Sequence, residues 1–338
     1  MAVSVREANL NQDQPILTSL AQNYLAASGG EKRFRWLYRE NPFGPARAWI
    51  AQGKNELAIG MAAIFPRRMY CDGGVVGGGV LGDLCVSPDY RSLGPALQLQ
   101  RACLECARSD DFAMAYDFPS TAMAGVYRHL GVEAAGESVR WVKALRAESF
   151  AKGLRVPVPR PLAAAVNATL ALRDRRSSRT SGVDFRLQEE ACTEEYSELA
   201  RGVGSSLGPC TVRSAEYLNW RYRRHPLVAY EFMTARRGKQ LLAYCVFTQS
   251  AESATVVELF GGGEDEGVLA GLVREVAALL RGRGVASLNL PMLASDKRNA
   301  LLRKLGFWAR EAVPVVLLGQ MAGPSGQHIV LMHGDRES

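Results

Sequence analysis

The chain has 338 residues, of which 47% are apolar and 22% are charged. This composition excludes a largely disordered protein, because enough apolar side chains are present to build cores, and the length favours two domains over one. The formal net charge of +7 suits an anionic ligand but is too small to indicate a nucleic-acid partner.

Apolar periodicity predicts alternating strands and helices over the first 147 residues. The expected strands cover residues 3–8, 46–52, 57–69, 80–86, 112–116 and 139–144, and the expected helices cover 14–26, 31–40, 95–108 and 122–130. The glycine-rich sequence of residues 73–79 predicts a flexible turn between two strands. This order indicates a mixed sheet flanked by helices, an α/β (α+β) fold.

An internal repeat divides the chain into two related parts. Residues 34–60 resemble residues 218–244, with tryptophan, tyrosine, arginine and proline in matching places, and residues 127–137 resemble residues 302–312. We therefore expect an N-terminal domain, a linker, a C-terminal domain and a tail, at residues 1–147, 148–182, 183–320 and 321–338.

The expected linker contains three closely spaced prolines, a short Ala/Leu-rich helix and several arginines. One interpretation is an interdomain helix that packs on the body of the protein. The alternative is that residues 161–179 contact an anionic membrane surface.

The cellular context is predicted from what the sequence lacks. No run approaches the about 18 to 20 apolar residues of a membrane-spanning helix, and the N-terminus has no signal-peptide pattern. The seven cysteines are scattered without zinc spacing, including the helical pair Cys103 and Cys106. We therefore expect reduced thiols, no metal and a cytoplasmic protein.

The segment from Val80 to Glu105 carries the strongest chemical signal. An apolar strand leads into Arg91, Ser92, Leu93, Gly94, Pro95 and Ala96 at the start of a long helix. Free N–H groups and the helix dipole favour an anion there, and Gly94 lets the backbone approach a ligand closely. The loop lacks the Gly-Lys-Ser/Thr of a P-loop and suits a pyrophosphate.

This loop, together with a helix that ends in Tyr127-x-x-x-Gly131, resembles the acyl-CoA signature of GNAT-type N-acetyltransferases. The resemblance implies two tandem GNAT-like domains, each a mixed, mostly antiparallel sheet flanked by helices. It also implies that Arg91, Ser92, Leu93, Gly94 and Ala96 bind the pyrophosphate of acetyl-CoA. Pro95 departs from the signature because it lacks an N–H donor, and Val132 replaces a common phenylalanine.

The second copy lacks this signature. Residues 256–269 contain no Arg-x-x-Gly-x-Ala loop, and three consecutive acidic residues there would repel a polyphosphate. Leu302 stands in the place of Tyr127. We therefore expect a degenerate C-terminal domain that shapes the acceptor site or supports the first domain.

The resemblance also implies roles for individual residues. Backbone N–H groups of Leu84, Cys85 and Val86 would polarise the thioester carbonyl, and Ser120 and Thr121 would lie near the pantetheine.

Two side chains are candidates for the proton transfers. Tyr127 would protonate the leaving thiolate, and Asp83 would act as the base, although a structural aspartate is the alternative. Asp117 is a weaker candidate for the base.

The leading hypothesis is an N-acyltransferase that uses acetyl-CoA as cosubstrate and an amine as acceptor. A small molecule, an amino sugar or polysaccharide precursor and a peptide amine all remain open as acceptors. One alternative is an aminoacyl-tRNA-dependent transferase on a tandem GNAT-like fold, which would need no pyrophosphate loop. The other is a non-catalytic module that senses acyl-CoA or acts as a scaffold.

Overall fold

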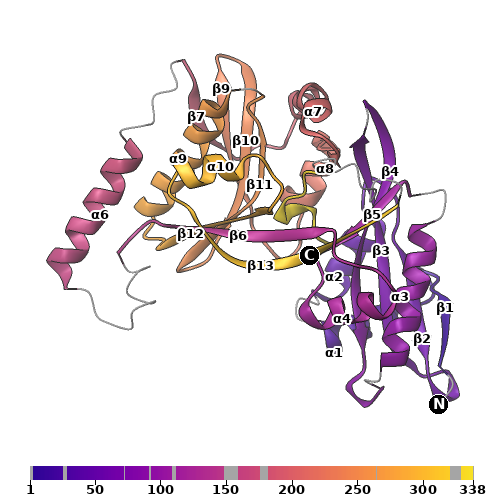
Figure 1. Cartoon of the computed structure of the whole chain (residues 1–338). Coiled ribbons are helices and arrows are strands. Elements are labelled where there is room, and N and C mark those ends of the chain that lie inside the picture. Colours follow the sequence, from indigo (N-terminus) through magenta and orange to yellow (C-terminus); the bar gives the residue numbers. More distant parts are fainter. Residues whose placement is uncertain are drawn as a thin grey trace.

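The strands of the described residues form one continuous mixed sheet. Its two parts, which we call the first and the second sheet, join through a pair of long strands at the centre of the molecule, and helices pack on both parts (Figure 1). The computed structural model describes residues 3–25, 29–71, 73–90, 93–108, 112–147, 159–175, 182–263, 265–319 and 329–337. We call residues 3–147 the first half, residues 182–319 the second half and residues 329–337 the tail. None of the helices within the described ranges combines the length and apolar character needed to cross a membrane.

The first sheet follows the chain order of the first half. It contains the strands β1 (Ser4–Glu7), β2 (Arg47–Gln52), β3 (Ala58–Cys71), β4 (Gly74–Val86) and β5 (Met114–Asp117). Neighbours from β1 to β4 are antiparallel, whereas β4 and β5 run parallel over Gly78–Val80 and Met114–Tyr116. The short strand β8 (Cys210–Thr211) adds to β3 from the second half.

Helices cover this sheet because the side chains of β3 alternate between its two faces. Met61 and Phe65 share one buried cluster with residues of α1 (Gln14–Tyr24), which is followed by α2 (Gly30–Phe34). Ile64 belongs to the other face, under α3 (Leu93–Ala107) and α4 (Thr121–His129).

The second sheet has the same plan. Its strands are β7 (Asp184–Gln188), β9 (Glu231–Arg237), β10 (Gln240–Gln249), β11 (Ser253–Gly261) and β12 (Ser287–Leu293). β11 and β12 form a parallel pair over Ser253–Thr255 and Ser287–Asn289, as β4 and β5 do in the first half. Its helices are α7 (Glu194–Leu207), α8 (Ala215–Leu218), α9 (Glu266–Gly282) and α10 (Asn299–Lys304).

Besides β8, the two halves exchange one long strand each. The strand β6 (Gly136–Ala144) ends the first half but pairs with β12 of the second sheet. The strand β13 (Trp308–Gly319) pairs with β5 through Val316–Gly319 and with β6 through its earlier residues. Each sheet is therefore completed by a strand of the other half, and the predicted domain boundaries stay a prediction.

A reciprocal tryptophan pair marks the contact between the halves. Trp36 and Trp220 stack with ring centroids 4.9 Å apart. The indole N–H of each donates to the backbone carbonyl of the other, at 2.8 and 2.9 Å. Both tryptophans lie in single π-helical turns, η1 (Arg35–Arg39) and η4 (Asn219–Arg223). Trp36 is 2% exposed and Trp220 is fully buried, so this pair is part of the core.

The mixed, mostly antiparallel sheets flanked by helices confirm the predicted fold class. One local prediction is wrong. Residues 74–79 are not a flexible turn but the beginning of β4, paired with β3. A Cβ at Gly78 would lie 2.6 Å from Met69 Cγ, and one at Gly79 would lie 2.7 Å from Ile64 Cδ1. These glycines therefore serve close packing within a strand.

The predicted linker helix is present as α6 (Arg160–Arg175), which stands away from the sheets (Figure 1). Its end is fixed by Asp174, which pairs with Lys143 at 2.7 Å and with Arg281 at 2.5 Å. Leu162 and Leu172 of this helix are about half exposed, at 55% and 49%. A membrane contact of residues 161–179 stays a prediction, and residues 176–179 lie outside the described ranges.

Candidate active site

The strands β4 and β5 separate after their short parallel contact. Their last paired residues are Val80 and Tyr116, so the part of β4 from Leu81 to Val86 has no partner strand on that side among the described residues. The N–H of Ser87 donates to Ile59 of β3 at 2.7 Å. Because N–H groups alternate in direction along a strand, those of Leu84 and Val86 face the open side. The role that the resemblance implies for them, polarising a thioester carbonyl, stays a prediction.

Asp83 lies at a bulge within this open segment. The pairing of β3 and β4 shifts register there, and Asp83 has a positive φ of 51°. The Arg33 guanidinium donates to both oxygens of its carboxylate at 2.8 Å, and the Tyr38 hydroxyl donates to one of them at 2.8 Å. All of these side chains are buried. The carboxylate is therefore held in a fixed position by partners on α2 and η1.

The predicted pyrophosphate loop is described only in part. Arg91 and Ser92 lie outside the described residues, and the described part of α3 begins at Leu93. Gly94 is exposed in the first turn of this helix, whereas Pro95 is buried and Ala96 is half-buried. The helix thus begins with an accessible glycine, a short distance along the chain from the open segment of β4.

Tyr127 is the centre of a buried hydrogen-bonded chain. Its hydroxyl donates to Asp117 Oδ2 at 2.7 Å and accepts from Gln100 Nε2 at 2.9 Å. Burial raises the pKa of Asp117 to about 7, and the negative charge of Glu337 adds to the shift. Burial also raises the pKa of Tyr127. This chain of hydrogen bonds joins the end of β5 to α4 and α3.

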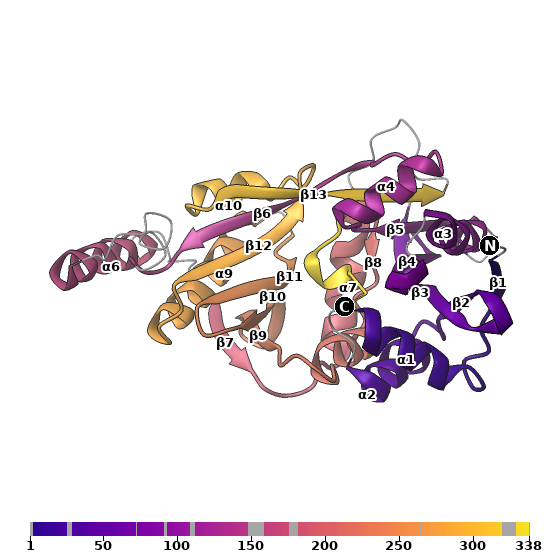
Figure 2. The ribbon, with the colours of Figure 1, turned by 90° about the horizontal axis from the view of Figure 1, so that it is seen from below.

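The tail brings a further carboxylate that the site residues chosen from the sequence do not include. Figure 2 shows the tail between the two halves, where the 3₁₀ turn η6 (His333–Asp335) lies. A Cβ at Gly82 would lie 2.5 Å from Glu337 Cγ, so this side chain packs directly on β4. Burial raises the pKa of Glu337, and the charge of Asp83 adds to the shift. Glu337 therefore connects the surroundings of Asp83 and Asp117 electrostatically.

The remaining predicted contacts lie at the start of α4. Ser120 caps this helix by accepting a hydrogen bond from the N–H of Met123 at 3.3 Å, and both Ser120 and Thr121 are exposed. Cys85 is 7% exposed and burial raises its pKa to about 12, so its thiol is chemically inert. By the same alternation its N–H points toward β3, so the geometry does not support the predicted contact of Cys85 with a thioester. A contact of Ser120 or Thr121 with pantetheine stays a prediction.

Comparisons with known proteins agree with this geometry. Residues 5–135 match the model of the acetyltransferase (GNAT) domain. This part of the chain is a GNAT acetyltransferase domain. Among curated protein sequences, none matches the chain significantly.

Solved structures resemble almost the whole chain. A conserved protein from Enterococcus faecalis is 12% identical, with a TM-score of 0.66 over 94% of this chain and 72% of that one. A GCN5-related N-acetyltransferase from Anabaena variabilis is 14% identical, with a TM-score of 0.65 over the same shares of the two chains. The N-myristoyltransferase of Saccharomyces cerevisiae with bound myristoyl-CoA is 12% identical, with a TM-score of 0.59 over 94% and 79%. At these identities the likeness shows a shared fold that extends beyond the GNAT domain.

The GNAT domain and its fold support an N-acyltransferase, and acyl-CoA is the cosubstrate of this family. The residues present fit an acyl-CoA, because the open side of β4 offers backbone donors and α3 begins with an accessible glycine. The second half differs at the matching place. Its helix α9 begins with acidic residues, and Leu302 replaces Tyr127.

Proposed function

We propose that the protein moves an acetyl group from acetyl-CoA to an amine and that the GNAT domain carries out the reaction. The observation that supports the proposal most strongly is the separation of β4 from β5 after Val80, with the Tyr127–Asp117 hydrogen bond at the end of β5. A thioester on the open side of β4 would have backbone donors at its carbonyl and a phenol on α4 for its sulfur.

The reaction is a direct displacement. The amine nitrogen forms a bond to the acetyl carbonyl carbon, and the bond from that carbon to sulfur breaks. The acceptor loses a proton, and the coenzyme A thiolate gains one. The N–H groups of Leu84 and Val86 would stabilise the negative charge that develops on the carbonyl oxygen.

Tyr127 is the proposed acid for the thiolate, and Asp117 its proton source. When the Asp117 carboxyl is neutral, it can donate its proton to the Tyr127 oxygen, which leaves the phenol proton for the sulfur. When Asp117 is ionised, it instead accepts the phenol proton, as the 2.7 Å hydrogen bond indicates. The acid step is therefore favoured below the pKa of Asp117, which is about 7.

Two carboxylates compete for the role of the base. Asp83 is the candidate from the sequence, but Arg33 and Tyr38 already donate to its oxygens. We therefore propose that Asp83 positions these side chains and that Glu337 accepts the proton of the acceptor amine. Glu337 packs on Gly82 of the same strand, and its raised pKa makes it a stronger base than an exposed glutamate.

Some parts of the proposal rest on the sequence alone. These are the acetyl group, an amine acceptor such as an amino sugar, and a cytoplasmic location. The second half is proposed to support the GNAT domain rather than to bind acetyl-CoA.

Ligand binding and turnover test the proposal together. We expect acetyl-CoA and coenzyme A to raise the thermal unfolding midpoint, whereas bulk tRNA leaves it unchanged. Coenzyme A release is then measured with acetyl-CoA and a panel of amines that includes glucosamine, lysine peptides and polyamines. Stabilisation without turnover on any amine would favour a sensor. A protein that acetyl-CoA does not stabilise is not an acetyl-CoA-dependent enzyme.

A further inference from the structure

We propose that the opened strand pair of the second half is a binding site for the chain's own tail, and that Arg213 and Arg221 thereby position Glu337 in the GNAT domain. This inference rests on the proposed function only for the catalytic role of Glu337. The anchoring of the tail stands on the contacts described below.

The second half has a carboxylate where the first half has Asp83. β11 and β12 separate after Thr255 and Asn289, and Glu258 follows three residues later, as Asp83 follows Val80 in β4. Glu258 accepts a hydrogen bond from Arg213 at 3.0 Å and one from Tyr222 at 3.1 Å. The partners match in kind, because an arginine and the tyrosine of a π-helical turn also hold Asp83.

The tail fills this second opening. Met332 forms an antiparallel bridge with Met292 of β12, and Val330 bridges to Cys210. A Cβ at Gly334 would overlap the Tyr222 hydroxyl, so only glycine fits at this point of the tail. The opening in the second half therefore holds a segment of protein where the first half is proposed to hold acetyl-CoA.

Buried charges then fix the tail. Arg213 donates to Asp335 Oδ2 at 2.9 Å as well as to Glu258, and all three side chains are at most 1% exposed. The same Asp335 oxygen accepts from the N–H of Met332 at 2.6 Å. Breaking such a buried pair is costly, since it leaves a charge without compensation.

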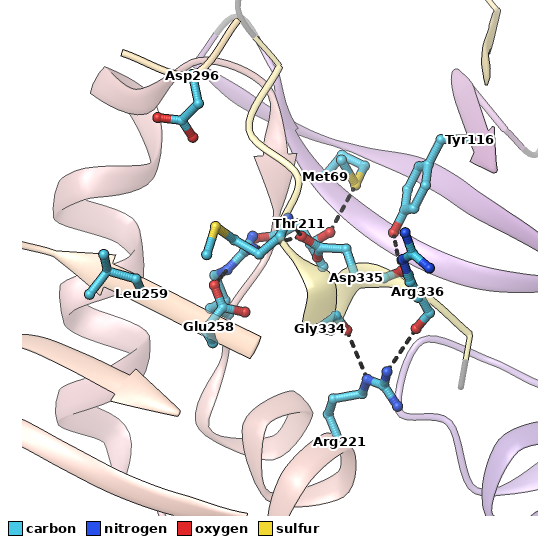
Figure 3. A network of polar contacts seen from close by, with 12 residues as sticks. Met69, Tyr116, Thr211, Arg221, Glu258, Leu259, Asp296, Gly334, Asp335 and Arg336 are labelled. Atoms are coloured by element: carbon cyan, nitrogen blue, oxygen red, sulfur yellow. Dashed lines mark hydrogen bonds and ion pairs between the residues drawn. The ribbon is translucent and has the colours of Figure 1, made fainter. Parts of the chain in front are cut away.

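Arg221 holds the last described residues by their backbone. Its guanidinium donates to the carbonyl of Gly334 at 2.9 Å and to that of Arg336 at 2.8 Å (Figure 3). Tyr116 of β5 donates to the carbonyl of Asp335 at 3.0 Å. Because the carbonyls of Gly334, Asp335 and Arg336 all accept hydrogen bonds, the direction in which the chain enters the GNAT domain is fixed. Glu337 is the next residue and lies against Gly82.

The anchoring is tested by trimming the 338-residue chain with carboxypeptidase Y and measuring the intact mass. We expect removal of Glu337 from the wild-type chain to be slow, and at least tenfold faster in Arg221→Met and in Asp335→Asn. The matched control is Arg236→Met, which removes a buried arginine that pairs with Glu195 and has no hydrogen bond to the tail. Glu337 that remains equally protected in both tail variants overturns the anchor. Urea unfolding of each variant identifies any that is not folded, and Asp335→Asn, the smaller change, then decides.

Positioning is tested by coenzyme A release with acetyl-CoA and the amine panel. We expect Arg221→Met to lower kcat at least tenfold without changing KM for acetyl-CoA, and Arg221→Lys to restore part of the loss. In the background of Glu337→Gln, the same change is expected to alter kcat less than twofold, because its effect passes through Glu337. Independent effects of the two substitutions would overturn the positioning role. A wild-type protein that neither binds nor uses acetyl-CoA overturns the proposed function and this role together, while the trimming result still decides whether the anchor exists.

Discussion

Asp83 and Glu258 occupy matching positions in the two halves, but their surroundings differ. Each follows a short parallel strand pair by three residues, and each is held by an arginine and by a tyrosine from a π-helical turn. Around Asp83 the strand keeps an open side, whereas around Glu258 the tail fills the space. The shared arrangement of strands therefore sets where the carboxylate lies, while the surrounding loops and the tail decide whether a substrate can enter.

The largest expected effect is on stability, and it is seen by comparing substitutions of Arg213 and Arg33. Arg213→Met leaves Glu258 and Asp335 buried without their shared cation, which typically costs about 3–5 kcal/mol of unfolding free energy. Arg33→Met breaks the ion pair of one buried carboxylate, that of Asp83. Urea unfolding is expected to show the larger destabilisation for Arg213→Met. Equal losses would show that the tail adds nothing to the second site.

The next effect concerns the two helix starts. Gly94→Glu places a carboxylate in the first turn of α3, and we expect affinity for acetyl-CoA to fall at least a hundredfold, about 2.7 kcal/mol, through repulsion and steric block. The control is Gly267→Glu in the first turn of α9, which should leave acetyl-CoA binding unchanged. Isothermal titration calorimetry measures both. Unchanged affinity in Gly94→Glu would falsify the assigned loop.

Tyr127→Phe tests the acid that the second half lacks. Removal of a general acid costs about a hundredfold or more in turnover, and we expect this loss in kcat with unchanged acetyl-CoA affinity. Tyr244→Phe is the control, since the Tyr244 hydroxyl is buried with no hydrogen-bond partner among the described residues. Stopped-flow or steady-state coenzyme A release separates the two. A Tyr127→Phe enzyme with wild-type kcat contradicts the assignment.

The smallest effect is a change in pH dependence. We expect kcat to fall as pH rises above about 7 in the wild-type protein, because the ionised Asp117 draws the phenol proton, and Asp117→Asn should remove this limb. Since the folded protein binds this proton more tightly than the unfolded chain, whose ordinary pKa is 3.8, unfolding free energy should also fall as pH rises from about 4 to about 7. Asp117→Asn should flatten that slope as well. Profiles unaltered by the substitution rule Asp117 out as the titrating group.

Local patterns allowed much of the first half to be predicted. The helix that became α3 and the apolar run that became β4 are set by residues close in sequence, and both lie near their predicted places. The seven glycine-rich residues before Val80 misled, because glycine signals both turns and tightly packed strands. Only the neighbouring side chains of Met69 and Ile64 distinguish the two cases.

Long-range placements could not be predicted in the same way. The apolar alternation of β6 is the same whichever sheet it joins, so the exchange with β13 leaves no local signal. The sequence likewise gives no signal that Glu337 packs on β4, since an acidic residue in such a segment is ordinary on a surface. The one available hint was the apolar segment Ile329–Met332 shortly before it, which is typical of a buried strand rather than of a free end.

The exchange of β6 and β13 has a consequence for how the molecule is made. One edge of β5 stays unpaired until Val316–Gly319 are synthesised. The ribosome adds these residues about 200 residues later, at about 5–20 residues per second. Until then, the nascent GNAT domain presents an unsatisfied row of backbone donors and acceptors to the cell. If the first half were expressed alone, this strand edge would remain unpaired. We therefore expect the separate fragment to aggregate rather than to form a minimal enzyme.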